Sequence, residues 1–156
     1  MLRGSLVGTM PNWIPINANF EADTRASFET QSALAHLGAR LGEIKAGMAE
    51  VLLPYDRKLA QHHGYLHAGV VTTIADTACG YAAYTLAAAR SDVLSVEFKV
   101  NLLEPAKGSS FLARARVLRK GKNLTVCQAE VEAHAAGKEN VLVAVMLATI
   151  SVRAPR

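Results

Sequence analysis

The sequence predicts an α+β domain in which one long, buried helix is wrapped by an antiparallel sheet of roughly six strands. Three observations predict this fold. Residues 68–89 are apolar almost all round, and a helix with no polar face is a buried helix. Four strand-like runs follow it and two shorter ones precede it. Because no other element is left to cover the helix, the sheet must wrap it.

The chain fits one domain. Its 156 residues are typical of a single domain, and a hydrophobic share of 51% is enough for a real core. Residues 1–20 contain several Gly, Pro and Asn residues and no long apolar run, so we interpret them as a loose N-terminal lead-in. Residues 21–156 then form the domain, without an internal repeat.

The elements ahead of the long helix are short. Residues 21–37 have a helical apolar face, with Asp23 or Thr24 placed to cap the start and Gly38 placed to end the helix. Residues 39–54 alternate between apolar and polar side chains, which predicts two strands joined at residues 45–47. A loop rich in histidine follows.

Turn signals separate the strands that follow the long helix. Gly and Pro residues mark turns near 104–108, 120–123 and 136–139. The runs after Gly108 are joined by short turns, which predicts a meander of antiparallel strands. The four predicted strands span residues 93–102, 110–119, 124–135 and 140–152.

Charge and composition exclude several classes of protein. The net charge of +4 favours a mildly basic surface, with a polyanionic partner as the alternative. The densest basic cluster suits a small phosphorylated ligand, because a protein that binds duplex nucleic acid more often has a longer basic stripe. We therefore expect no nucleic-acid partner. The cluster consists of Arg114, Arg116, Arg119, Lys120 and Lys122.

The sequence predicts a protein of the cytoplasm without metal or cofactor. No apolar run is long enough to span a membrane, and the N-terminus lacks the apolar core of a signal peptide. Cys79 and Cys127 lack a C-x-x-C partner, so we interpret them as buried hydrophobic residues of a reducing compartment. The spacing of the three histidines, His62, His63 and His67, matches no zinc motif.

One residue of the predicted long helix is anomalous. Asp76 is the only charged side chain between His67 and Arg90. Burying an unpaired carboxylate costs several kcal/mol. Asp76 therefore lies in a pair, at an interface or in a cleft. A structural contact between two subunits is the alternative to a catalytic role, which we favour because buried acids usually serve a site.

The start of the same helix offers backbone N–H groups that could act together with the Asp76 carboxylate. Its free N–H groups and positive dipole end polarise a carbonyl group placed there. A carboxylate two turns further on attacks the carbonyl carbon or activates a water molecule. On one chain the two features are about 12 Å apart along the helix axis. A two-fold dimer would bring the Asp76 of one chain to the helix start of the other, so the geometry favours a shared site.

The segment around the start of the predicted long helix resembles the signature of a known family. The stretch from Gln61 to Thr77 resembles the signature of the PaaI-like hotdog thioesterases: an Asn or Gln, a His-Gly-Gly at the helix start, and an acid nine residues after the His. Residues 95–101 and 103–106 also suit that family, and only residues 1–20 fall outside the resemblance. It implies the hotdog fold and hydrolysis of an acyl-CoA.

The resemblance implies a role for each matching residue. Asp76 becomes the nucleophile or the general base, and the Ala68 N–H polarises the thioester carbonyl while Gly69 permits its close approach. Relatives usually have Gly at the Ala68 position, and a methyl group there crowds the carbonyl and limits φ.

Three further residues complete the predicted site. By the same resemblance, Gln61 orients the lytic water or the carbonyl, His67 shapes the oxyanion pocket, and Thr77 is a candidate hydroxyl helper. Family members place the acid across a dimer interface, and an open sheet edge also requires a partner. We therefore expect a homodimer, and a tetramer made of two dimers as the final assembly.

The nucleotide end of CoA is strongly anionic and requires cations. Arg119, Lys120 and Lys122 concentrate positive charge at one predicted turn, where Gly121 lets the backbone approach a phosphate. We expect this turn to contact the nucleotide phosphates. The alternative is a solvated hairpin turn, in which Lys and Gly are common.

Three rival functions differ in their requirements. A non-catalytic protein that binds acyl-CoA would not need both Asp76 and Gln61. A hydratase of the same fold would be expected to show an Asp-x-x-x-x-His pair, but Tyr81 occupies the fifth position after Asp76. A purely structural role for the protein would not explain why Asp76 lies in an apolar helix.

Overall fold

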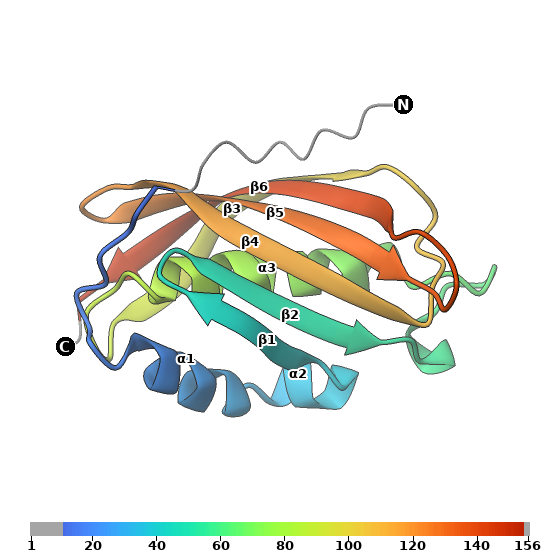
Figure 1. Ribbon diagram of the computed structural model, residues 1–156, viewed down its shortest axis with the longest axis horizontal. Helices are drawn as coiled ribbons and strands as arrows, with labels where there is room; N and C mark the ends of the chain where they lie inside the picture. Colours follow the sequence, from blue (N-terminus) through green and yellow to red (C-terminus); the bar gives the residue numbers. More distant parts are fainter. Residues whose placement is uncertain (1–10, 155–156) are drawn as a thin grey trace.

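The computed structural model describes residues 11–154, and in it an antiparallel sheet of six strands curves around one long helix, α3 (Figure 1). The predicted fold class is confirmed. Two shorter helices, α1 and α2, lie beside the β1–β2 end of the sheet. The elements are α1 (Phe20–Glu29), α2 (Ser32–Leu37), β1 (Arg40–Lys45), β2 (Met48–Pro54), the 3-10 turn η1 (Arg57–Leu59), α3 (Ala68–Tyr84), β3 (Asp92–Leu102), β4 (Ser110–Lys120), β5 (Leu124–His134) and β6 (Val141–Arg153).

The strand order is β1-β2-β4-β5-β6-β3. The predicted meander is confirmed, because β4, β5 and β6 are consecutive antiparallel neighbours. The strand β3 follows α3 in the chain but pairs with β6 at the far side of the sheet. Both β1 and β3 are therefore edge strands, and one edge of β3 is unpaired among residues 11–154.

The core lies between α3 and the inner face of the sheet. Buried and less buried residues alternate along β5, as expected for a strand with one covered face. Ala113 and Ala115 of β4 are fully buried, as are Ile74 and Ala78 of α3. Because so many of these side chains are small, the strands approach the helix axis closely.

The helix α3 is shorter than the sequence predicts. It ends at Tyr84 rather than at residue 89, although the next residues include several alanines, which are good helix formers. The cause is Thr85, which is fully buried. Its Oγ1 accepts a 2.8 Å hydrogen bond from the Gly47 N–H in the β1–β2 turn and donates to the Ala82 carbonyl. This tertiary bond ties the chain to the sheet and ends the helix.

The single helix predicted for residues 21–37 is also wrong, because the structure divides it into α1 and α2. Gln31 has an extended backbone between them, and its Nε2 donates to the Tyr81 hydroxyl of α3 at 2.6 Å. Asp23 and Thr24 lie inside α1 and do not cap it. Gly38 ends α2 as predicted, with φ of +73°.

The sheet does not cover α3 all round, which corrects the expectation of a fully buried helix. One stripe of the helix is only half-buried within the chain. It consists of Thr72, Thr73, Asp76, Thr77 and Gly80. Asp76 therefore lies on the face of α3 that the chain's own sheet leaves open.

No helix or strand precedes Phe20 among the described residues, and residues 1–10 of the predicted lead-in lie outside them. In the remaining part, Trp13 packs against the β1–β2 turn. A Cβ at Gly47 would lie 2.3 Å from the Trp13 ring, so this contact requires glycine. Among residues 11–154, no helix is long and apolar enough to cross a membrane.

Candidate active site

Asp76 is held by a residue that the sequence analysis missed. The Ser95 hydroxyl of β3 donates a 2.6 Å hydrogen bond to Asp76 Oδ1. Ser95 pairs opposite the fully buried Ile150, so it lies on the inner face of the sheet, beside α3. The register of β3 shifts immediately after Ser95. A single serine in a strand does not indicate a functional site from the sequence. The register shift also breaks the simple alternation from which the side of the sheet could be predicted.

The carboxylate of Asp76 lines a cavity of about 490 Å³ between α1, α3 and the start of β3. Thr77 lines the same cavity. Thr72 and Thr73 bond back to helix carbonyls, as helical threonines often do. The Thr77 hydroxyl has no hydrogen-bond partner among residues 11–154, so it is available to a ligand. Asp76 and its sequence neighbour Thr77 thus line the same cavity.

The start of α3 presents one free backbone donor. His67 caps the helix, and its Nδ1 accepts a 2.9 Å hydrogen bond from the Gly69 N–H. A Cβ at Gly69 would lie 3.1 Å from that nitrogen, so glycine leaves space for the imidazole. The Ala68 N–H has no acceptor in the described part of the chain. Ala68 is thus the residue whose N–H is available to a carbonyl oxygen.

The methyl group of Ala68 does not strain the backbone. Ala68 is the first residue of α3, and its φ is negative, since Arg90 is the only described residue other than glycine with a positive φ. An L-residue therefore fits this position without conformational cost.

Gln61 lies beside Ala68, as the motif predicts. Both line a second cavity, of about 340 Å³, whose other walls are mostly apolar. The Gln61 side-chain oxygen accepts from the His63 N–H, and this bond leaves the side-chain NH₂ group to donate. Two neutral donors, the Ala68 N–H and the Gln61 amide, therefore border one cavity. This arrangement suits stabilisation of a developing oxyanion.

The two groups of predicted residues do not meet within one chain. Asp76 and Thr77 line one cavity, whereas Gln61 and Ala68 line the other. Asp76 follows Ala68 by eight residues in the same helix, which places them about 12 Å apart along the axis. Each chain therefore carries two incomplete halves of the predicted site.

The two thiols supply no nucleophile to this site, and the described residues form no metal centre. Burial raises the pKa of the Cys79 thiol well above its usual range, and the nearby Cys127 and Asp76 raise it further. Burial also raises the pKa of Cys127 to about 12. Neither thiol is therefore a nucleophile near neutral pH. Among residues 11–154, no three potential ligands are grouped to hold a metal ion.

The predicted basic cluster is divided between the two faces of the sheet. On the outer face, Arg114 forms a 2.7 Å ion pair with Glu50, and Arg116 donates to Gln128. Arg119 pairs opposite Val126, whereas Lys120 pairs opposite the buried Thr125. Paired residues share a face, so Lys120 lies on the inner side and Arg119 does not.

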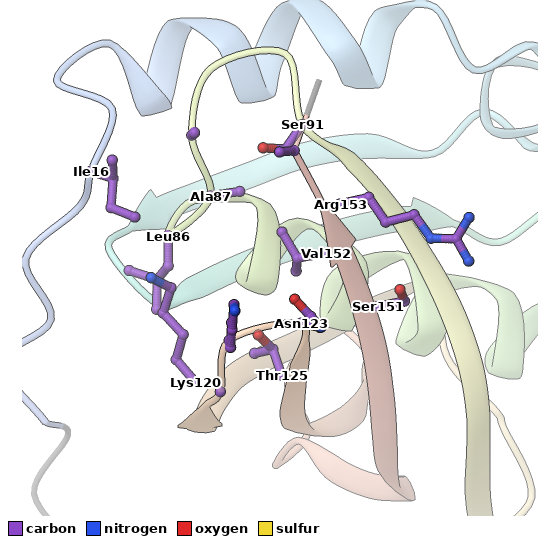
Figure 2. A pocket seen from close by; sticks show the side chains of 14 residues that line it. Ile16, Leu86, Ala87, Ser91, Lys120, Asn123, Thr125, Ser151, Val152 and Arg153 are labelled. Carbon is purple, nitrogen blue, oxygen red and sulfur yellow. The ribbon is translucent and has the colours of Figure 1, made fainter. Parts of the chain in front are cut away.

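Lys120, Gly121 and Lys122 line a third cavity, at the far end of α3 (Figure 2). The Gly121 N–H donates to the Leu124 carbonyl at 2.8 Å, so it is not free to bind a phosphate. A Cβ at Gly121 would lie 2.7 Å from that same oxygen. Glycine at this position is therefore required by the turn itself.

A long helix wrapped by this curved sheet, with an acid on its open face and free donors at its start, defines the chain as a hotdog-fold protein. The protein belongs to the thioesterase superfamily, whose family model matches residues 63–138. A thioesterase family protein from Silicibacter pomeroyi has a similar crystal structure, with 46% identity and a TM-score of 0.83. The match covers 86% of this chain and 98% of that protein.

Two further comparisons agree with this assignment. A relative from Halobacterium salinarum, whose name places it provisionally among the esterases, is 30% identical over 122 residues, which are 72% of this chain and 80% of the relative. The E. coli PaaI protein from the phenylacetic acid degradation operon has a TM-score of 0.75 at 21% identity, covering 87% of this chain and 94% of PaaI. At that identity the similarity to PaaI supports the fold alone.

Proposed function

We propose that this protein hydrolyses an acyl-CoA thioester to a free acid and CoA, at a site that two copies of the chain share. The observation that carries the proposal is the position of the Asp76 carboxylate. It is held by Ser95 at 2.6 Å on the open face of the helix whose start presents a free N–H. An acid and an oxyanion site are the two components that thioester hydrolysis requires.

In the proposed reaction, the thioester oxygen accepts hydrogen bonds from the Ala68 N–H and the Gln61 amide. As a general base, Asp76 takes a proton from a water molecule, whose oxygen attacks the carbonyl carbon. The tetrahedral oxyanion then collapses, the C–S bond breaks, and the CoA sulfur takes the proton. As a nucleophile, the carboxylate instead attacks the carbon and expels CoA, and water hydrolyses the resulting anhydride.

A two-fold dimer through β3 would unite the two half-sites. In the described part of the chain the outer edge of β3 has no strand partner, and Leu94, Val96 and Phe98 are 55%, 57% and 42% exposed. An exposed apolar edge strand normally pairs with another chain or is covered. Pairing two copies along β3 would also turn the open stripes of the two α3 helices toward each other.

We further propose that two such dimers associate as a tetramer. Leu118, Leu124 and Leu147 are also exposed, on β4, β5 and β6. Apolar side chains exposed on neighbouring strands are suited to contact between dimers.

The direct test is hydrolysis of a panel of acyl-CoA thioesters, followed by free thiol release, with the wild type and Asp76→Asn. The variant keeps the side-chain oxygen that accepts from Ser95 but loses the carboxylate. We expect kcat to fall by about a hundredfold or more, the scale of a lost general base. Asp56→Asn is the matched control, because an amide oxygen there still accepts from the Lys58 N–H.

Near-wild-type turnover by folded Asp76→Asn would exclude the carboxylate mechanism. Binding of acyl-CoA by the wild type without any turnover would instead identify a non-catalytic acyl-CoA-binding protein.

A further inference from the structure

The cavity beside Gln61 and Ala68 lies at the start of α3 and has a volume of about 340 Å³. At the roughly 30 Å³ that a molecule of liquid water occupies, it has room for about ten non-hydrogen atoms. Three of its lining residues, Leu66, Val71 and Val143, are apolar and almost fully buried. The cavity therefore suits an alkyl chain of medium length.

In the proposed reaction this cavity is next to the reacting carbonyl group. The thioester oxygen lies at the Ala68 N–H and the Gln61 amide, and both residues line the cavity. Of the two substituents on the carbonyl carbon, the pantetheine arm carries two amides, which require hydrogen-bond partners when they leave water. Apolar side chains cannot supply such partners. The acyl chain is therefore the substituent that fits this cavity.

One residue of the lining carries a charge. Glu104, in the segment between β3 and β4, is exposed at the cavity, and every other lining side chain except that of Gln61 is apolar. The Glu104 carboxylate forms no ion pair or hydrogen bond with another residue in the range 11–154. It therefore places a negative charge without a partner beside an apolar cavity.

The backbone on both sides of Glu104 is restrained. The Leu103 N–H donates to a carbonyl of β6 at 2.9 Å, and the Ala106 carbonyl accepts from the Leu66 N–H at 3.0 Å. Between these two bonds, Pro105 fixes its own φ and disfavours a helical conformation at Glu104. The carboxylate therefore extends from a defined position in the cavity wall.

An acyl chain that ends in a carboxylate meets two obstacles in this cavity. Its charge loses hydration against the apolar residues. It also meets the like charge of Glu104, and this repulsion becomes stronger where the ligand displaces water, because the effective dielectric constant falls. A neutral chain meets neither obstacle. Repulsion of one ligand at no cost to another is a physical means of specificity.

We propose that Glu104 is a specificity-determining residue that rejects acyl groups ending in a carboxylate. The preferred substrates are then thioesters of neutral, medium-chain acids of up to about ten carbons. This inference rests on the proposed function, because it assigns the acyl end of the same substrate. Glu104 takes no part in the bond changes, so its effect falls on KM and leaves kcat little changed.

The first arm of the test measures binding without turnover, with two thioether analogues of CoA that cannot be hydrolysed. S-hexyl-CoA carries a neutral chain, and S-(5-carboxypentyl)-CoA carries a chain of the same length that ends in a carboxylate. Both are titrated calorimetrically into the full-length wild type, Glu104→Gln and Glu104→Lys. We expect Glu104→Gln to lower the Kd of the carboxylate analogue about tenfold and Glu104→Lys to lower it further, while the Kd of S-hexyl-CoA stays within about twofold.

The second arm compares hydrolysis of hexanoyl-CoA with that of adipoyl-CoA, in which a carboxylate replaces the terminal methyl group. The wild type should prefer hexanoyl-CoA, and Glu104→Gln should lower KM for adipoyl-CoA about tenfold with kcat little changed. A third substrate, 6-hydroxyhexanoyl-CoA, is polar but uncharged and separates charge from polarity. Its KM should stay within about twofold of the wild-type value in Glu104→Gln.

Glu29→Lys is the charge-matched control for Glu104→Lys. Glu29 is the last residue of α1, is exposed, and lines neither of the two cavities. Its substitution makes the same change in net charge, so it shows any general effect of charge on an anionic ligand. We expect Glu29→Lys to discriminate between the charged and the neutral chain as the wild type does.

The outcomes separate this inference from the proposed function. Equal changes for the charged and the neutral chain in Glu104→Lys, or no change for either, would overturn the role of Glu104. Discrimination between the thioethers that depends on Glu104, without turnover of any acyl-CoA, would refute the hydrolase and support the specificity site. Efficient hydrolysis of hexanoyl-CoA with an unmoved KM for adipoyl-CoA in both Glu104 variants would support the hydrolase and refute the specificity site. Binding of neither thioether would overturn both.

Discussion

At the scale of single residues, the hydrogen bond from Ser95 to Asp76 determines what the acid can do. It fixes Oδ1 and leaves Oδ2 without a hydrogen-bond partner among residues 11–154. Ser95 comes from β3, so the acid is oriented by the strand that we propose as the dimer interface. We therefore propose that Ser95 is a positioning residue that acts through Asp76.

We predict that Ser95→Ala lowers kcat about tenfold, the effect of one hydrogen bond to a charged group, and changes KM little. Ser95→Thr keeps the hydroxyl group and should restore most of the rate. Steady-state kinetics of the three proteins checks this. If Ser95→Thr were as slow as Ser95→Ala, or if only KM changed, the positioning role would be refuted.

The sequence was sufficient to select Asp76 as a candidate site residue. Burying an unpaired carboxylate in an apolar helix costs free energy, so such a residue is expected to have a partner or a functional role. Gln61 and Ala68 were predicted from the family motif, and both line one cavity. Ser95 was not found, because its contact with α3 depends on the crossing of β3 to the far edge of the sheet. The division of the basic cluster depends on strand register, which composition does not reveal.

At the scale of elements, local signals predicted the strands well and the helices less well. Each of the four long strands begins and ends within one residue of its predicted bounds. The alternation of apolar and polar side chains and the glycines at turns depend only on neighbouring residues, so both can be recognised in the sequence. The ends of α1 and α3 depend instead on the bonds of Gln31 and Thr85 to distant residues. Such tertiary bonds override helix propensity.

The Thr85 contact leads to a prediction about stability. Thr85→Val removes the acceptor of the buried Gly47 N–H, and an unsatisfied buried donor costs about 1–3 kcal/mol. Thermal unfolding should show a Tm lower by about 2–4 °C for each kcal/mol lost. Thr30→Val is the control, because the Thr30 hydroxyl bonds only at an exposed site. Equal Tm values for the two variants would contradict this account of the helix end.

At the scale of the whole molecule, the proposed function requires a second copy of the chain. Asp76, the proposed oxyanion donors and the apolar edge of β3 are all exposed to solvent, at least in part, in one copy. The shared site was predicted from the distance between Asp76 and the start of the helix, and from the family resemblance. The sequence did not predict the sheet order, because pairing between β3 and β6 is a non-local property.

Phe98→Glu tests the proposed interface. Phe98 pairs opposite the fully buried Ala148 on the inner face but remains 42% exposed. A charge there should be costly to bury, so we expect a monomer by light scattering and a loss of activity that recovers as protein concentration rises. Ile14→Glu is the control, since Ile14 is 86% exposed in the N-terminal segment. A fully active Phe98→Glu monomer would exclude the shared site.

The central claim is that one chain's Asp76 works with the Gln61 and Ala68 of another. The most direct measurement mixes two impaired variants, Asp76→Asn and Gln61→Ala, after partial unfolding and refolding to exchange subunits. Each mixed dimer would contain one intact site and one doubly damaged site. With random exchange, the mixture should recover about a quarter of wild-type activity, because half of the dimers are mixed and half of their sites are intact. Recovery of no activity above that of the separate variants, with exchange verified by mass, would contradict the shared site.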